Sequence, residues 1–122
     1  MKGYRKISID GLDKKWGKLV RDRDGSCRYC GLTTNLAAHH IFGRGRSGTR
    51  YVLDNGITLC PSHHVFNDTF SAHKTPEKFQ RWVKKFLGIG LWKSLQRMSL
   101  SGVTREKARK EFQEFLRGQN DA

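Results

Sequence analysis

The chain has 122 residues, with 24 Lys and Arg against 11 Asp and Glu, so its formal net charge at neutral pH is +13. This length allows one domain with a modest core, and the charge predicts an anionic partner. Three cysteines are an odd number, and residues 1–11 lack the pattern of a signal peptide, which together argue against a secreted disulfide framework. No apolar run approaches the roughly 20 residues that cross a bilayer, so we expect an intracellular protein without a membrane partner.

The excess positive charge lies at the two ends of the sequence. The net charge is +4 for residues 1–25, +2 for residues 26–73 and +7 for residues 74–122, and the middle segment holds every cysteine and histidine. This distribution predicts a metal-organised centre between basic helical arms. We therefore expect a single domain over 1–122, divided into an N-terminal helix at 10–24, a core at 27–73 and a helical C-terminal arm at 74–122.

The first predicted helix spans about residues 10–23, with Asp10 as the candidate N-cap and Gly25 beyond its end. Its apolar residues share one helical face; they are Leu12, Trp16, Leu19 and Val20. Short strands are predicted at 36–42 and 56–60, and the glycine-rich stretch 43–48 is predicted to be a loop.

The C-terminal arm is predicted to contain three helices. The first follows the triplet Thr75-Pro76-Glu77, in which Thr75 is a candidate N-cap and Pro76 suits a first turn. Apolar residues recur at helical spacing after it and again around 91–98 and 104–116. The elements together indicate a mostly helical α+β protein.

Two pairs of metal-ligating residues, each separated by two residues, lie in the core segment. Cys27 and Cys30 form the first pair, and Cys60 and His63 form the second. Three thiolates and one imidazole suit a tetrahedral structural zinc ion, which would support a chain with little core. The alternative is three unrelated buried cysteines.

Adjacent histidines, His39 and His40, lie in the first predicted strand. Strand alternation places them on opposite faces, so we expect one to bind an ion and the other to accept a proton at neutral pH. A His pair of this kind can also be simple surface polarity. Asn55 is expected to start the second strand, and His64 follows His63 directly, at the start of the next predicted helix. Both favour the functional interpretation, because closure of the zinc site draws His64 toward the hairpin.

The segments CRYC, AHH, DNG and LCPSHH, in this order, resemble the HNH endonucleases, and their flanks look like small phage and prophage members. The resemblance covers about residues 27–73. It implies a ββα-metal core, in which a two-stranded hairpin and a helix surround one catalytic divalent cation such as Mg²⁺ or Mn²⁺. It also implies hydrolysis of DNA phosphodiester bonds that leaves 5′ phosphate and 3′ hydroxyl ends.

Carried over by position, the resemblance makes His39 and His64 ligands of the catalytic ion and His40 the general base. Asn55 is the middle letter of the motif and either binds the ion or orients the base through the backbone. His63 replaces a more common cysteine of the family, and His39 often corresponds to an aspartate. Histidine at position 39 makes the catalytic site softer and widens its tolerance to manganese, nickel or cobalt.

Several further residues have two open interpretations. Asp68, four residues after His64, is either another metal ligand on the same helical face or an acid favoured by the helix dipole. His73 is interpreted as a structural hydrogen-bonding residue rather than a ligand. Basic residues of the glycine-rich loop either contact DNA phosphates or are solvated; they are Arg44, Arg46 and Arg50.

The predicted function is thus that of a metal-dependent endonuclease acting on DNA. In a second hypothesis the chain is a zinc-stabilised nucleic-acid-binding accessory protein without cleavage activity. A third is an RNA-directed or toxin-like nuclease with the same core. Phosphate contacts position a protein without reading bases, and the small chain has no separate recognition module, so we expect a weakly specific or structure-directed enzyme.

Overall fold

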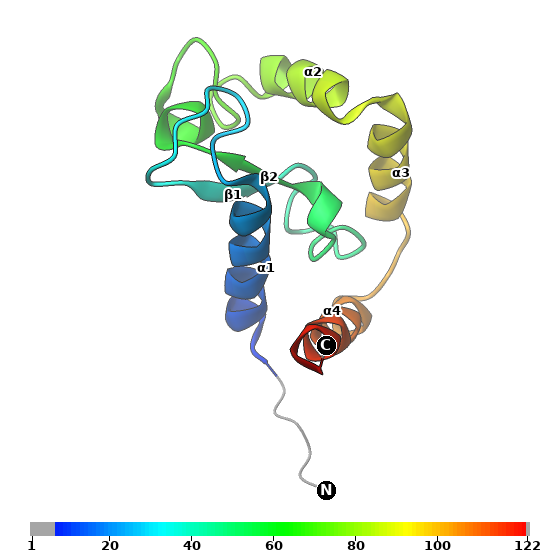
Figure 1. Cartoon of the computed structure of the whole chain (residues 1–122). Coiled ribbons are helices and arrows are strands. Elements are labelled where there is room, and N and C mark those ends of the chain that lie inside the picture. Colours follow the sequence, from blue (N-terminus) through cyan, green and yellow to red (C-terminus); the bar gives the residue numbers. More distant parts are fainter. Residues whose placement is uncertain (1–6, 122) are drawn as a thin grey trace, which may run out of the picture.

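A computed structural model describes residues 7–121, and its architecture is a small antiparallel hairpin surrounded by helices (Figure 1). Within these residues there are four α-helices and two strands, which is a mostly helical α+β fold. The predicted chain boundaries at residues 1 and 122 lie outside the described part. The elements in chain order are α1 (Ile9–Asp24), β1 (Ala37–His40), η1 (Leu53–Asn55), β2 (Gly56–Leu59), η2 (Ser62–Phe66), α2 (Pro76–Leu87), α3 (Ile89–Ser99) and α4 (Arg105–Asp121).

Helix α1 begins one residue earlier than predicted, and its N-cap is Ser8 rather than Asp10. The Ser8 hydroxyl accepts a hydrogen bond from the Gly11 amide at 3.0 Å. Ile7 and Leu12, on either side of this cap, belong to the same apolar cluster, an arrangement that fixes where the chain enters the helix. The helix ends as predicted at Gly25, whose φ of 71° is the left-handed conformation that glycine adopts without strain.

The hairpin pairs β1 with β2 in antiparallel register, with His39 opposite Ile57 and His40 opposite Gly56. Both strands are shorter than predicted. Asn55 does not start the second strand, because it closes the single helical turn η1 immediately before it. The glycine-rich stretch 43–48 between the strands is free of helix and strand, as predicted.

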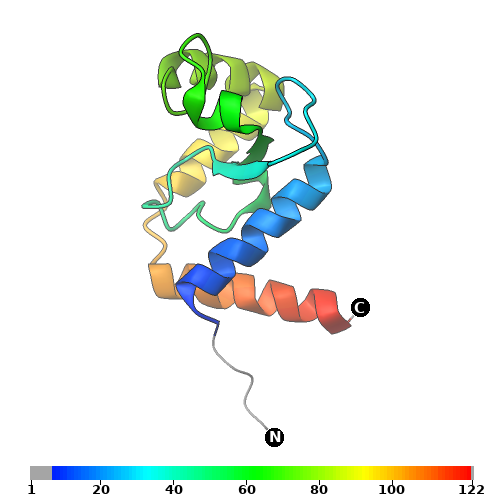
Figure 2. The same ribbon diagram turned by 90° about the vertical axis from the view of Figure 1, so that its left-hand side faces the viewer.

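Helix α1 lies across one side of the hairpin, and the approach is close at Gly56. A Cβ atom on Gly56 would lie 2.5 Å from Val20 Cγ2 and 2.7 Å from Trp16 Cζ2, so only glycine fits. Helix α4 crosses α1 (Figure 2) and completes this apolar cluster with Phe112, whose ring stacks on Tyr51 at 5.2 Å.

A second apolar cluster fills the other side of the hairpin, where α2 and α3 pack. It contains Ile57 and Leu59 from β2, Phe79 and Val83 from α2, and Trp92 from α3. The hairpin is therefore held between two small cores. Pro76 occupies the start of α2, but Thr75 does not cap it with its side chain, contrary to the prediction. Its hydroxyl instead donates to the Ser71 carbonyl and accepts from the Ser71 amide, both at 2.9 Å.

The helix expected after Cys60 is reduced to the five-residue turn η2, which ends at Phe66. Asn67 stops it, because its side-chain oxygen accepts hydrogen bonds from the amides of Thr69 and Phe70 and so bends the chain. The chain then returns, and the amides of Ala72 and His73 donate to the carbonyls of His63 and His64. None of the helices in the described part is long and apolar enough to span a membrane.

Candidate functional site

Cys27, Cys30, Cys60 and His63 form one cluster, in which all four ligand atoms lie within 4.8 Å of one another. The Cys30 and Cys60 sulfurs are 3.7 Å apart, and Cys60 Sγ is 3.3 Å from His63 Nδ1. A disulfide would require a sulfur separation of about 2.05 Å. Tetrahedral ligands held at about 2.3 Å from an ion are instead separated by about 3.8 Å. The predicted four-ligand cluster is therefore present, and it could hold a structural metal ion.

Backbone bonds bring the two ligand pairs together. The Cys27 amide donates to the Leu32 carbonyl, and Gly31, with a φ of 85°, donates back to Cys27. The Arg28 amide donates to Thr58 of β2, which ties this turn to the strand that leads into Cys60. Burial tends to raise the pKa of Cys27, but backbone hydrogen bonds from Cys30 and Cys60 outweigh it and lower this pKa overall. A lowered pKa favours the thiolate that binds metal.

A second cluster joins His39, His64 and His73, whose ligand atoms also lie within 4.8 Å of one another. His64 Nε2 and His73 Nε2 are 3.1 Å apart. His39 and His64 are the two ligands that the sequence analysis expects at a catalytic ion. It expects His73 only as a structural hydrogen-bonding residue. Backbone hydrogen bonds that return the chain to η2 place His73 in this cluster. The spacing of the histidines in the sequence does not predict this return.

Two imidazoles of this second cluster, those of His39 and His64, have a lowered pKa. Burial, with the nearby charges of His64, His73 and His40, lowers the pKa of His39 to about 3. Phe79 contributes to this environment, because its ring meets His39 edge-on at 5.3 Å. Burial also lowers the pKa of His64, and His73 acts in the same direction. Neutral imidazole is the form that coordinates a metal ion.

His40 is held apart from both clusters, between α1 and the loop after β1. Its ring stacks on Trp16 with centroids 3.8 Å apart and an interplanar angle of 8°. Its Nε2 lies 2.9 Å from the carbonyl oxygen of Arg50. A carbonyl can only accept, so Nε2 carries the proton and Nδ1 retains its lone pair. Burial lowers the pKa of His40, although the Arg50 carbonyl and the charge of Asp13 oppose this shift.

Asn55 is fully buried, and its side chain is hydrogen-bonded to the loop that follows β1. Its oxygen accepts from the Phe42 amide at 2.8 Å, and its nitrogen donates to the carbonyls of Phe42 at 3.0 Å and Thr49 at 3.1 Å. Of the two roles that the sequence left open, this geometry corresponds to backbone orientation. Asn55 is outside both groups of potential metal ligands in the described part of the chain.

The three loop arginines differ in what they can contact. Arg50 is largely buried and pairs with Asp13 at 2.7 Å, so its charge is used inside the fold. That pairing raises the pKa of Arg50. Arg44 lies 3.8 Å from the same carboxylate but remains 64% exposed in its side chain, and Arg46 is also exposed. Of the three, Arg44 and Arg46 therefore expose their side chains to solvent, and Arg50 does not.

Asp68 lies outside both groups of potential metal ligands in the described residues. The helical face expected to carry it is absent, because η2 ends at Phe66. Its carboxylate is 87% exposed and pairs with Lys74 at 3.0 Å. The premise that placed Asp68 one helical turn after His64 is thus wrong.

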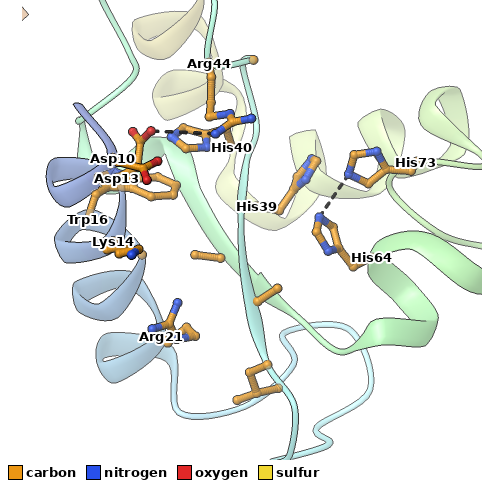
Figure 3. A pocket seen from close by; sticks show the side chains of 15 residues that line it. Asp10, Asp13, Lys14, Trp16, Arg21, His39, His40, Arg44, His64 and His73 are labelled. Atoms are coloured by element: carbon orange, nitrogen blue, oxygen red, sulfur yellow. Dashed lines mark hydrogen bonds and ion pairs between the residues drawn. The ribbon is translucent and has the colours of Figure 1, made fainter. Parts of the chain in front are cut away.

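An open cleft of about 640 Å³ brings His39, His40, His64 and His73 to one surface. Figure 3 shows His40 beside Trp16 and Arg44 on one side of the strand, while His39 faces His64 and His73 on the other side. Helix α1 forms the opposite wall and adds Lys14 and Arg21, which the sequence analysis did not single out. The sequence indicates that Lys14 and Arg21 line the cleft only through their positions on the helical face that also carries Trp16 and Gly17.

Comparison with known proteins leaves the family of this chain open. No protein-family model, no curated protein and no solved structure matches it.

Proposed function

We propose that this protein is a metal-dependent endonuclease of the HNH type that hydrolyses DNA phosphodiester bonds, with His40 as the general base. The observation that supports this best is the setting of His40, a neutral and oriented imidazole that shares a cleft with the cluster of His39, His64 and His73. A hydrolase needs a proton acceptor beside the group that it cleaves, and this cleft offers one.

The geometry of His40 suits proton transfer. Because Nε2 donates to the Arg50 carbonyl, the lone pair on Nδ1 is free to take a proton from a water molecule. Stacking on Trp16 fixes the plane of the ring, and the Trp16 indole is itself held by a hydrogen bond to the Val52 carbonyl at 3.0 Å. The activated water would attack phosphorus in line with the departing 3′ oxygen. Asn55 is hydrogen-bonded to the same loop at Phe42 and Thr49 and acts as a positioning residue.

Two ions fit the donor groups of the chain. The three thiolates and one imidazole of the first cluster match a structural zinc. Imidazoles of the second cluster, His39 and His64 among them, match a catalytic divalent cation. Such an ion, when bound, stabilises negative charge on the phosphate and on the leaving oxygen.

Charge supports DNA as the substrate. The chain carries a net +13, and three basic residues line the cleft that contains His40, against two acids, Asp10 and Asp13. The basic residues are Lys14, Arg21 and Arg44. Basic side chains that neutralise phosphates release counterions, which supplies most of the affinity for nucleic acid without sequence preference. We propose that the backbone of the scissile strand lies along the wall of the cleft that helix α1 forms.

The direct test is nicking of supercoiled plasmid by purified protein with divalent ions, with chelator, and with ions restored. We expect nicks that carry 5′ phosphate ends, that stop with chelator and return when ions are restored. Tight DNA binding without nicks under any metal would favour the accessory-protein hypothesis. Parallel assays on single-stranded DNA, branched DNA and RNA define the substrate, and cleavage of RNA alone would favour the RNA-directed nuclease.

A further inference from the structure

The three histidines of the second cluster are arranged so that their ring nitrogens can meet at one point. Their rings are steeply inclined to one another, with angles of 71° between His39 and His64, 78° between His39 and His73 and 71° between His64 and His73. The corresponding centroid distances are 5.2, 5.3 and 4.6 Å. Because the ligand nitrogens also lie within 4.8 Å of one another, rings inclined in this way can present lone pairs to one ion from three sides.

The spacing of the nitrogens agrees with shared coordination. Imidazole nitrogens bind a first-row metal ion at about 2.0–2.1 Å, so neighbouring ligands at octahedral or tetrahedral angles are about 2.9–3.4 Å apart. The separation of His64 Nε2 and His73 Nε2 is 3.1 Å. A simple hydrogen bond between two imidazoles has a similar length, and the presence of His39 as a third ring is what favours a metal ion.

From this arrangement we infer that His73 is a third protein ligand of the catalytic ion, and that the resulting all-imidazole site selects a first-row transition metal ion over Mg²⁺. The inference rests on the proposed function and assigns a ligand and a metal class to its site. Imidazole suits ions such as Co²⁺, Ni²⁺ and Zn²⁺, while Mg²⁺ prefers carboxylate and water oxygens.

Carboxylates that could make the site suitable for Mg²⁺ lie elsewhere. Among the described residues, no Asp or Glu belongs to the cluster. Asp68, the nearest acid in sequence to His64, pairs with Lys74 and points into solvent. Asp13 is in the cleft, but its carboxylate pairs with Arg50 and Arg44 on the His40 side, as Figure 3 shows for Arg44.

His73 is pre-positioned by the backbone. Its amide donates to the His64 carbonyl at 3.0 Å, and the preceding Ala72 amide donates to the His63 carbonyl at 2.9 Å. Ser71 and Thr75 close the other end of this segment through reciprocal hydrogen bonds. The segment that carries His73 is thus fixed to the turn that carries His63 and His64, so little ordering is needed when an ion binds.

The test uses protein loaded with one equivalent of zinc, which the thiolate-rich cysteine cluster takes up first. This protein is titrated with Co²⁺ alone and with Mg²⁺ alone and followed by calorimetry and by visible absorption of Co²⁺. Sulfur-to-cobalt charge transfer reports any exchange into the cysteine site. Parent protein should bind one further Co²⁺ far more tightly than Mg²⁺. His73→Ala should weaken Co²⁺ binding by at least the roughly 10- to 100-fold that accompanies loss of a partner of a metal ligand. Lys74→Ala is the matched control, because it breaks only the ion pair with Asp68.

Other outcomes separate the inference from the proposed function. Unchanged Co²⁺ affinity in His73→Ala would overturn the inference and leave His73 as a hydrogen-bonding partner of His64. Tighter binding of Mg²⁺ than of Co²⁺, or no additional ion in the parent, would also overturn it. Binding of Co²⁺ that depends on His73, in a protein that nicks no nucleic acid with any metal, would support the metal site and contradict the nuclease.

Discussion

Replacement of Gly56 by alanine tests how closely helix α1 packs against the hairpin at the position opposite His40. The backbone at Gly56 has φ −107° and ψ 143°, which any residue adopts, so the effect is purely steric. The new Cβ would lie 2.5 Å from Val20 and 2.7 Å from Trp16, both of which are at most 1% exposed and have no room to move. Overpacking of this kind costs about 1–3 kcal/mol. Reduced backbone freedom of the unfolded chain offsets about 0.5–1 kcal/mol of it.

The midpoints of these two ranges give a net loss of about 1 kcal/mol, or about 4 °C in Tm for a domain of this size. Urea and thermal denaturation measure it, and Gly90→Ala is the matched control. Position 90 lies in α3, and a Cβ there meets no atom within 4 Å, so stability should be unchanged or slightly raised. The displaced Trp16 ring also stacks on His40, so nicking should fall at temperatures where the variant is folded. A Gly56→Ala protein as stable as its parent would refute the proposed packing.

Three further predictions concern the metal, the pH dependence and the DNA contacts. Cys60→Ser should lose about one tightly bound zinc ion per chain together with cooperative unfolding; metal loss with unchanged melting would contradict the structural role. Burial tends to raise the pKa of Asp24, but hydrogen bonds from Arg23 and Thr58 lower it overall, so the charged form stabilises the fold. Asp24→Asn should thus be less stable at pH 7, and its deficit in urea unfolding should shrink as the pH falls below about 4; a deficit that persists at low pH contradicts this. Joint replacement of Arg44 and Arg46 by alanine should reduce the slope of log affinity for duplex DNA against log salt by about two, with anisotropy as the readout; an unchanged slope would exclude them from the interface.

Local signals in the sequence were sufficient for the four α-helices and for the cysteine cluster, but not for the segment after Cys60, where the expected helix is the short turn η2. Helical spacing of apolar residues marks α1 and α2, and the two-residue separation within each ligand pair limits how far Cys27 and Cys30 can lie from one another. The N-cap of α1 was misplaced, because Ser8 and Asp10 are both good capping residues. The choice depends on packing between Ile7 and Leu12.

The composition of the cleft depends on contacts between distant segments, which spacing does not reveal. His73 joins His39 through a chain reversal that begins at Asn67, and the same reversal removes Asp68 from the predicted face. The stack of Trp16 on His40 likewise requires α1 to cross the hairpin at Gly56. Arg50 was interpreted as a candidate for phosphate contact because its partner, Asp13, is 37 residues away in the sequence.

The most direct test of the proposed function is the single-turnover nicking rate of His40→Ala compared with the parent at equal zinc content. Removal of a positioned proton acceptor should lower this rate by about 10² to 10⁴, and additional divalent ion should not restore it. His64→Ala is the informative comparison, because loss of a metal ligand should be partly recovered at higher ion concentration. If His40→Ala nicks DNA at the parental rate, His40 is not the general base and the proposed active site is wrong.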